Sequence, residues 1–243
     1  MTKLPTIRSL DDLRRILADL PGPDEAARQA AAARESQLTK PPGSLGRLEG
    51  LSAWLAAWQG RHPPRLEHPQ AHVFAGNHGV AAQGVSAYPA EVTAQMVANF
   101  EAGGAAINQM CRTFGVALGV DALNLDRPTR DISQAPAMDE DDVAAALRAG
   151  MAALKPDCDL LCLGEMGIAN TTPAAALCLA LFGGEAAEWT GPGTGVQGAA
   201  LENKAAVVAG AVGRHRQAGG DPLETLRRLG GRELAAIAGA VVA

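Results

Sequence analysis

The sequence predicts an α/β fold in which helices flank a Rossmann-like parallel sheet. Two short apolar runs, at residues 72–75 and 159–164, each end at a glycine, as buried parallel strands do. Helix-forming segments alternate with such runs along the chain, which is typical of βαβ units. Aromatic residues make up only 3% of the chain while alanine and glycine are abundant, which favours helices packed closely on a sheet over an aromatic-rich sandwich.

The first 60 residues are expected to form a helical segment that contributes to a small domain outside the main sheet. Residues 10–35 predict two polar amphipathic helices, separated by a Pro-Gly-Pro sequence at 21–23. Residues 40–49 predict a stiff loop, because Pro41 and Pro42 lack backbone donors. Ser44 is expected to cap the following helix, which runs to about residue 58.

Residues 61–243 are expected to form a Rossmann-like α/β domain. The predicted strands occupy residues 72–75, 115–120 and 159–164, and the last of these has the clearest pattern. The predicted helices occupy about 89–99, 103–113 and 139–153, then an alanine-rich segment that stops at Gly183 and Gly184, and finally 205–212.

Charge and hydropathy narrow the classes of partner. The net charge of −5 comes from 21 basic and 26 acidic residues that are interspersed, so no basic stripe indicates a nucleic acid or an anionic membrane. No run approaches the ~18 apolar residues of a membrane span. Residues 1–5 lack the apolar core of a signal peptide. We therefore expect a cytoplasmic protein that acts on small molecules.

Cysteine and histidine spacing predicts no metal site. The four cysteines lie among Ala, Leu and Val without C-x-x-C spacing, so we expect reduced core residues; zinc ligation is the alternative and would need histidines at short spacing. Four of the five histidines lie in polar or proline-rich surroundings and are expected to be exposed. These residues are Cys111, Cys158, Cys162 and Cys178, and His62, His68, His72 and His215.

The segment 164–173 lies between the strongest predicted strand and a predicted helix, and loops at the carboxyl ends of strands are where ligands bind in open α/β sheets. Asn170, Thr171 or Thr172 is expected to cap the helix, and the free backbone amides there suit a phosphate. An ordinary helix start is the alternative. It leaves Glu165 unexplained, because a carboxylate there more naturally meets ribose hydroxyls or a base.

A second glycine-rich loop, at 189–196, leads to Lys204. The sequence places this lysine in the first turn of a helix, where its charge opposes the helix dipole, and a bound phosphate would compensate it. Local neutralisation by Glu202 is an equally good explanation.

Asn77 and His78 follow the first predicted strand and lie where a ligand can be reached, although stabilising a turn is the commoner role of such residues. Tyr88, the only tyrosine, lies in the apolar loop 84–89. It is expected either to form one wall of a flat aromatic pocket or to pack in the ordinary way.

These stretches, taken together and in order, resemble the nicotinate-nucleotide:dimethylbenzimidazole phosphoribosyltransferases. The matching segments are 40–49, 76–80, 164–176 and 203–204. The resemblance implies a Rossmann-like sheet, a small helical domain built from both chain termini, a homodimer, and no metal or organic cofactor. It also implies the transfer of phosphoribose from nicotinate mononucleotide to 5,6-dimethylbenzimidazole during cobalamin synthesis, giving α-ribazole 5′-phosphate and nicotinate.

The same resemblance implies roles for particular residues. Glu165, Gly167 and Lys204 are expected to hold the ribose and phosphate, and a second group is expected near the benzimidazole. The benzimidazole group comprises Ser86, Tyr88 and Gln95, and the remaining expected substrate-binding residues are Pro42, Gly43, Ser44, Asn77, His78, Asn170, Thr171 and Thr172.

One part of the family pattern is missing. The family's general base is a glutamate near the C-terminus, and this chain stops at Ala243, after a stretch that resembles a helix from the middle of the family's chain. We therefore expect the base to lie beyond Ala243, and not to be Glu233, which begins a helix at a different point of the pattern. A sheet edge is expected to be uncovered. The alternative function is a non-catalytic fragment that binds the nucleotide or the benzimidazole.

Overall fold

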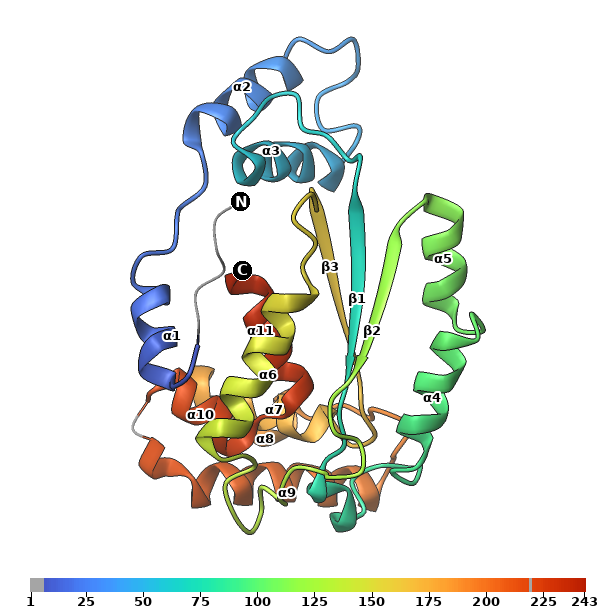
Figure 1. Ribbon diagram of the computed structural model, residues 1–243, viewed down its shortest axis with the longest axis vertical. Coiled ribbons are helices and arrows are strands. Elements are labelled where there is room, and N and C mark those ends of the chain that lie inside the picture. Colours follow the sequence, from blue (N-terminus) through green and yellow to red (C-terminus); the bar gives the residue numbers. More distant parts are fainter. Residues whose placement is uncertain (1–6, 219) are drawn as a thin grey trace.

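A computed structural model describes residues 7–218 and 220–243. Residues 1–5, which are predicted not to form a signal peptide, lie outside the described residues. Three strands form a parallel sheet in the order β2-β1-β3 (Figure 1). They are β1 (Pro69–Ala75), β2 (Ala117–Ala122) and β3 (Leu160–Met166). The predicted α/β fold with a parallel sheet is therefore confirmed.

Helices lie on both sides of this sheet (Figure 1). On one side, α4 (Val92–Glu101) and α5 (Ala106–Phe114) contact β2. On the other side, α6 (Glu140–Ala153) and α11 (Arg232–Val242) pack on each other, and α11 contacts β1 and β3. The buried Phe74 of β1 packs against Ala236 and Ala240 of α11, which fixes this helix on the sheet.

A third group of elements lies at the carboxyl ends of the strands (Figure 1). It begins with the 3-10 helix η1 (Gly79–Gln83), which follows β1. The others are α7 (Thr171–Phe182), α8 (Ala186–Trp189), α9 (Ala199–Arg214), η2 (Arg216–Ala218) and α10 (Pro222–Leu229). Helix α7 contacts α8, α9 and α10, so this end of the sheet carries a layer of helices.

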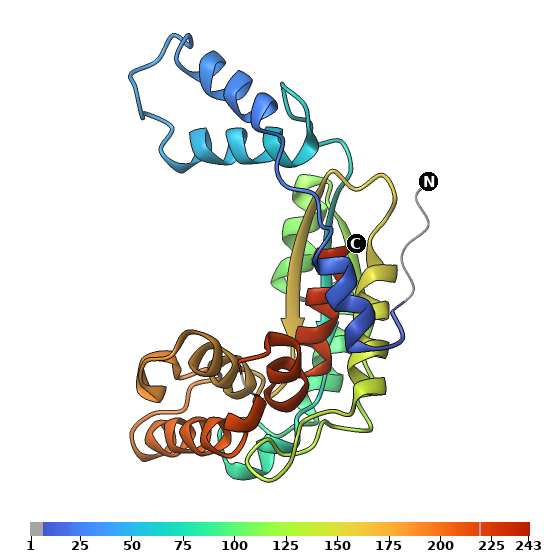
Figure 2. The same ribbon diagram turned by 90° about the vertical axis from the view of Figure 1, so that its left-hand side faces the viewer.

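The N-terminal helices are in two places. Helix α1 (Leu10–Leu17) packs on the main body, where Leu10 and Leu13 join the principal core. By contrast, α2 (Glu25–Glu35) and α3 (Arg47–Gln59) form a hairpin beyond the amino ends of the strands (Figure 2). Thus only the second of the two predicted N-terminal helices lies outside the main body.

Ion pairs of Lys40 connect α2 to α3 within the hairpin. The Nζ atom of Lys40 lies 2.6 Å from Glu35 and 2.5 Å from Glu49. The prediction that Ser44 caps the second helix is wrong. The chain enters α3 through Gly46, whose φ of 56° takes the N-cap position without a side-chain hydrogen bond.

Several predicted element bounds differ from the structure: β1 begins three residues earlier than expected, and α4 and α5 each begin about three residues later. The second strand begins two residues later than expected, because Gly115, at φ 66°, ends α5 before the chain turns into β2. Helix α9 begins at Ala199, six residues earlier than expected, after Gly198 at φ 53°. Lys204 is therefore in the second turn of α9, and the argument from an unfavourable dipole in the first turn does not apply.

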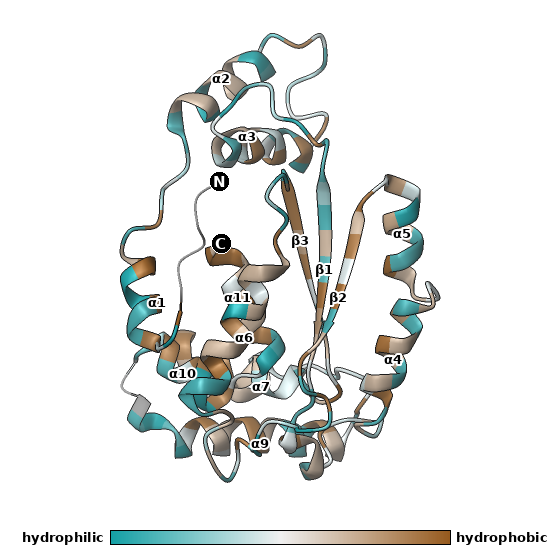
Figure 3. Ribbon diagram, viewed as in Figure 1, coloured by the Kyte–Doolittle hydropathy of each residue, from teal (hydrophilic) through white to brown (hydrophobic). Residues whose placement is uncertain are grey.

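The cysteine prediction is partly wrong. All four thiols are free and Cys111 is buried, but Cys158 and Cys178 are only half-buried and Cys162 is exposed. Cys162 lies on β3, which within the described residues pairs with a strand on one side only, and Figure 3 shows that this strand is hydrophobic along most of its length. An apolar strand at the sheet edge therefore leaves a thiol accessible, in line with the expected uncovered edge.

The histidine prediction holds for His62 and His68, which are exposed, and is wrong for the other two. His72 is buried in the central strand, with its Nε2 3.1 Å from Asp121 of β2. A ring nitrogen of buried His215 lies 2.9 Å from the carbonyl oxygen of Ile132, and burial lowers the pKa of this histidine. Within the ranges that the structure describes, no helix has both the length and the apolar content to cross a bilayer.

Candidate functional site

The loops that leave β1 and β3 are held against each other. Phe74 of β1 is in register with Glu165 of β3, and the backbone N–H of Gly76 donates to the carbonyl oxygen of Met166 at 2.9 Å. Gly167 passes so close to Gly76 that a Cβ atom there would lie less than 3.0 Å from its carbonyl oxygen. Only glycine fits at this crossing, so two loops far apart in the sequence meet at one point.

Glu165 stands at the carboxyl end of β3. The side chain of Asn170 donates a hydrogen bond to its carboxylate. Although Glu165 retains an exposed surface, the protein that crowds its carboxyl group raises its pKa, the negative charge of Glu233 raises it further, and His78 acts in the opposite direction. Glu165 is therefore a carboxyl group whose protonation responds to its neighbours.

Helix α7 begins immediately after this loop. Asn170 occupies the N-cap position, as predicted, but its side chain bonds to Glu165 instead of to the helix backbone. Thr171 is the first helical residue, and Thr172 is buried. No side chain caps α7, but the amide of Thr172 donates to the carbonyl oxygen of Ala169 at 3.0 Å and Pro173 has no N–H. Within the described residues, the amide of Thr171 is therefore the group at this helix start that is available to an anion.

Lys204 reaches the same helix start from α9. The lysine is 1% exposed, and its Nζ donates to the hydroxyl of Thr171 at 2.7 Å and to the carbonyl oxygen of Gly191 at 2.9 Å. Burial lowers its pKa. No ion pair involving Lys204 occurs among residues 7–218 and 220–243, so neutralisation by Glu202 is not observed.

The glycine-rich loop 189–196 closes over this ammonium group. A Cβ atom at Gly193 would lie 2.8 Å from both the Nζ of Lys204 and the hydroxyl of Thr171, and Gly193 has a φ of 55°. Because Asn170 holds Glu165 and the adjacent Thr171 holds Lys204, the carboxylate and the ammonium flank one helix start.

Of the residues predicted to lie near the benzimidazole, Ser86 lies beside the same loop. The hydroxyl of Ser86 is 2.8 Å from that of Thr194, and the amide of Ala87 donates to Thr194 at 3.1 Å, so these contacts join loops 84–89 and 189–196. Tyr88 is 56% exposed, which argues against ordinary packing and leaves its aromatic face accessible. Gln95, on α4, is also exposed.

Asn77 and His78, in the loop after β1, are buried and contact other segments of the protein. Asn77 donates to the carbonyl oxygen of Leu125 at 2.9 Å, in the turn-stabilising role considered from the sequence. His78 lies against Glu233 of α11, with 3.0 Å between Nε2 and Oε1. Direct contact of Asn77 or His78 with a ligand stays a prediction.

The remaining predicted residues lie elsewhere. Pro42, Gly43 and Ser44 are exposed in the α2–α3 connection, at the amino ends of the strands, whereas the other site residues are at the carboxyl ends (Figure 2). Within one chain, the structure therefore does not bring residues 42–44 to the site.

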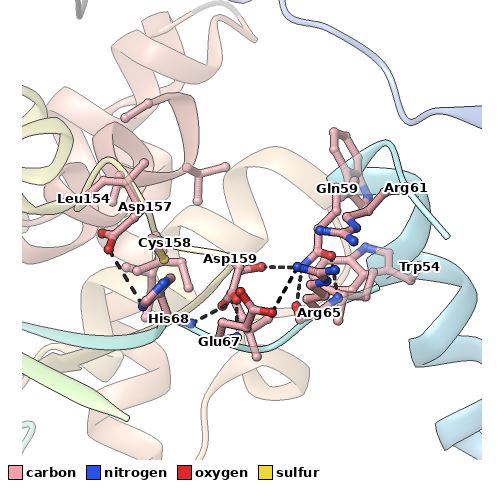
Figure 4. A pocket seen from close by; sticks show the side chains of 18 residues that line it. Trp54, Gln59, Arg61, Arg65, Glu67, His68, Leu154, Asp157, Cys158 and Asp159 are labelled. Atoms are coloured by element: carbon pink, nitrogen blue, oxygen red, sulfur yellow. Dashed lines mark hydrogen bonds and ion pairs between the residues drawn. The ribbon is translucent and has the colours of Figure 1, made fainter. Parts of the chain in front are cut away.

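A cavity of about 630 Å³ also lies at the amino ends, between α3, β3 and the end of α11 (Figure 4). Several of its polar groups are paired with one another. The side chain of Gln59 donates to the carbonyl oxygens of Arg65 at 2.7 Å and Asp159 at 2.9 Å, and the Asp159 carboxylate accepts from the amide of His68 at 2.9 Å. The hydrogen bonds in this cavity join segments of the fold to one another, and Lys204 does not line it.

Two residues of the site were not identified from the sequence. Thr93 of α4 is fully buried, and its hydroxyl accepts a hydrogen bond from the amide of Ile168 at 3.0 Å, which anchors the loop after β3. Glu233 begins α11, as expected, but the same position places it beneath His78. The adjacent glycines 230 and 231 are a sequence signal that could have indicated a close approach there, although the sequence analysis did not interpret them so.

A parallel sheet whose carboxyl ends carry a buried lysine, a carboxylate and an open helix start defines an α/β protein with a site for an anionic small molecule. A family model described as phosphoribosyltransferase matches residues 20–243. The chain belongs to the nicotinate-nucleotide:dimethylbenzimidazole phosphoribosyltransferase family, as the resemblance of its motifs indicated.

Individual relatives agree with this assignment. A nicotinate-nucleotide–dimethylbenzimidazole phosphoribosyltransferase of Cereibacter sphaeroides is 60% identical over 233 residues, which are 96% of this chain and 69% of the relative. The enzyme of that name from Ruegeria pomeroyi is 60% identical over 240 residues, covering 99% of this chain and 71% of the relative. The crystal structure of the Thermus thermophilus enzyme aligns with a TM-score of 0.79 at 40% identity, covering 89% of this chain and 70% of that chain.

Proposed function

We propose that this chain binds nicotinate mononucleotide at the carboxyl ends of its sheet and transfers the phosphoribosyl group to 5,6-dimethylbenzimidazole. The products are α-ribazole 5′-phosphate and nicotinate, in the assembly of the lower ligand of cobalamin. The observation that carries the proposal is Lys204, a buried cation whose hydrogen-bond partners are both neutral oxygens. A buried charge of this kind is costly unless a ligand of opposite charge compensates it.

Each residue near the start of α7 has a role in this proposal. The phosphate binds between Lys204 and the amide of Thr171, where the helix dipole also favours a negative charge. Glu165 accepts hydrogen bonds from the ribose hydroxyls. Gly167 lets the loop after β3 pass close to Gly76, which holds that loop, and Glu165 before it, in place for the ribose.

The chemistry needs positioning more than covalent help. Nicotinate mononucleotide carries a cationic pyridinium, so breaking its bond to C1′ releases a neutral ring, while a benzimidazole nitrogen attacks C1′ from the opposite face. Holding the two rings in line supplies most of the acceleration. Ser86, Tyr88 and Gln95 are proposed to hold the benzimidazole. One benzimidazole proton must pass to a general base. We propose that this base is a glutamate outside the 243 residues.

We propose that residues 42–44 contact the substrate only in a homodimer, at the site of the partner subunit. In a homodimer, the α2–α3 hairpin of one subunit can supply Pro42, Gly43 and Ser44 to the site of the other, which one chain alone does not do. We also propose that residues 1–60 contribute, through the α2–α3 hairpin, to a small domain distinct from the α/β domain of residues 61–243, on which α1 packs. We propose further that the protein acts in the cytoplasm. No metal or organic cofactor enters this scheme.

Titration calorimetry with nicotinate mononucleotide tests the proposal. Saturable binding is expected, and Lys204→Ala should weaken it by about 10- to 150-fold, which corresponds to the roughly 1.5–3 kcal/mol of a hydrogen bond to a charged group. Lys155→Ala is the matched control, since that lysine is exposed at the other end of the sheet. Equal affinities for the two variants would contradict the proposal. Formation of α-ribazole 5′-phosphate then separates an enzyme from the alternative, a fragment that only binds.

A further inference from the structure

His78 and Glu233 form a fully buried pair beneath the candidate site. Both side chains are 0% exposed, and Nε2 and Oε1 are 3.0 Å apart. Among the residues that the structure describes, none of the four polar atoms of these two side chains has an aligned hydrogen-bond partner. The approach of the two groups is therefore their main electrostatic compensation, and a buried carboxylate without compensation is strongly unfavourable.

Three glycines enclose this pair, one from each of three segments. A Cβ atom at Gly76 would lie 2.6 Å from Glu233 Oε2, and one at Gly167 would lie 3.2 Å from His78 Nε2. A Cβ atom at Gly231 would lie 2.6 Å from Glu233 Oε1. The loops after β1 and β3 and the start of α11 thus close on the pair with no room for a methyl group.

The pair is electrostatically coupled to Glu165. The charge of Glu233 raises the pKa of Glu165 and that of His78 lowers it. Within the described ranges, these are the charged groups that act on Glu165, one from the loop after β1 and one from α11. Asn170, the third neighbour, is neutral and donates to the carboxylate.

We propose that His78 and Glu233 are positioning residues for Glu165. They fix the spacing of the two loops and balance the charge that Glu165 meets when it binds the ribose of the nucleotide. This inference rests on the proposed function, in which Glu165 is a ribose ligand. It assigns the pair a role in the chemistry of the site, whereas a pair that only anchors α11 would leave the behaviour of Glu165 unchanged.

The affinity for nicotinate mononucleotide, measured between pH 4 and pH 8, tests this. The affinity should fall as Glu165 takes up a proton. Glu233→Gln removes a charge that raises the pKa of Glu165, so the midpoint should move to lower pH, by roughly one unit. His78→Gln removes the opposing charge and leaves Glu233 in place, so the midpoint should move to higher pH. The double variant should return it to near the wild-type value.

Glu224→Gln is the matched control, because this carboxylate is paired with arginines on α10 and should leave the midpoint unchanged. Midpoints that coincide with wild type in both single variants, with affinity merely reduced, would overturn the inference and leave the proposed function standing. Circular dichroism shows whether the two single variants and the double variant fold. Loss of the fold in all three would also overturn the inference, since the pair would then serve only the fold. Absence of nucleotide binding by the wild-type chain would instead count against the proposed function itself.

Discussion

Helices α6 and α11 approach each other through two glycines, and Gly239→Ala tests how much of the fold depends on this. A Cβ atom at Gly239 would lie less than 3.0 Å from the carbonyl oxygen of Leu147, a distance that real Cβ atoms do not show. At the facing Gly150 it would meet the carbonyl oxygen of Ala236 in the same way. The obstructing atoms are backbone atoms of a helix, which cannot rotate aside.

The expected loss follows from two opposing effects. Alanine in a helix interior is favoured over glycine by about 0.5–1 kcal/mol. Against this, α11 must move away from α6 by roughly an ångström before ordinary contact is restored, and overpacking of this kind costs about 1–3 kcal/mol, with larger losses on record. We expect Gly239→Ala to lower the free energy of unfolding by about 1–2 kcal/mol.

Urea unfolding followed by circular dichroism measures this loss. Gly210→Ala in α9 is the matched control: the glycine is also helical, a Cβ atom there meets nothing within 4 Å, and the variant should gain about 0.5–1 kcal/mol. Equal unfolding free energies for the two variants would refute the close crossing. Because α11 carries Glu233 at its start, Gly239→Ala should also weaken nucleotide binding, whereas Gly210→Ala should not.

Three further predictions concern single side chains. Two arginines lower the pKa of Glu224 to about 2, so its contribution is present above the unfolded value of 4.5 and is lost as pH falls toward 2. Glu224→Gln should therefore cost about 1 kcal/mol in urea unfolding at pH 7 and nothing near pH 2; a constant difference would be inconsistent. Thr93→Val leaves the buried amide of Ile168 without its acceptor and should cost about 1–3 kcal/mol, whereas Thr93→Ser should keep most of the stability. Burial lowers the pKa of Lys204, so wild-type stability should rise with pH from that lowered value to about 10.4, and this rise should disappear in Lys204→Met when unfolding is followed across alkaline pH.

The segment around α7 could be predicted from sequence because its signals are local. The strand, the loop and the helix start follow one another within about fifteen residues, so Glu165, Asn170 and Thr171 were placed together correctly. Lys204 was identified for a partly wrong reason. The sequence placed it at a helix start, but α9 begins earlier, and it is the burial of Lys204 that makes it unusual.

What the sequence did not predict depends on contacts between distant segments. His78 and Glu233 come from opposite ends of the α/β portion, and no local pattern pairs them. The burial of His72 and His215 likewise follows from the sheet and helices that cover them. The loop containing Ser44 matched the family pattern, yet the direction of the α2–α3 hairpin, which carries it away from the carboxyl ends, is a property of the tertiary structure.

The lone buried ammonium of Lys204 also has a practical consequence for anyone handling the purified protein. Common oxyanions of the solvent, such as sulfate and inorganic phosphate, have the charge and the geometry to occupy the helix start and would act as counterions. Each tenfold excess of such an ion over its dissociation constant adds about 1.4 kcal/mol to the apparent stability. Melting temperatures taken in phosphate and in a zwitterionic buffer would then differ, and a weak substrate would be displaced from the former preparation.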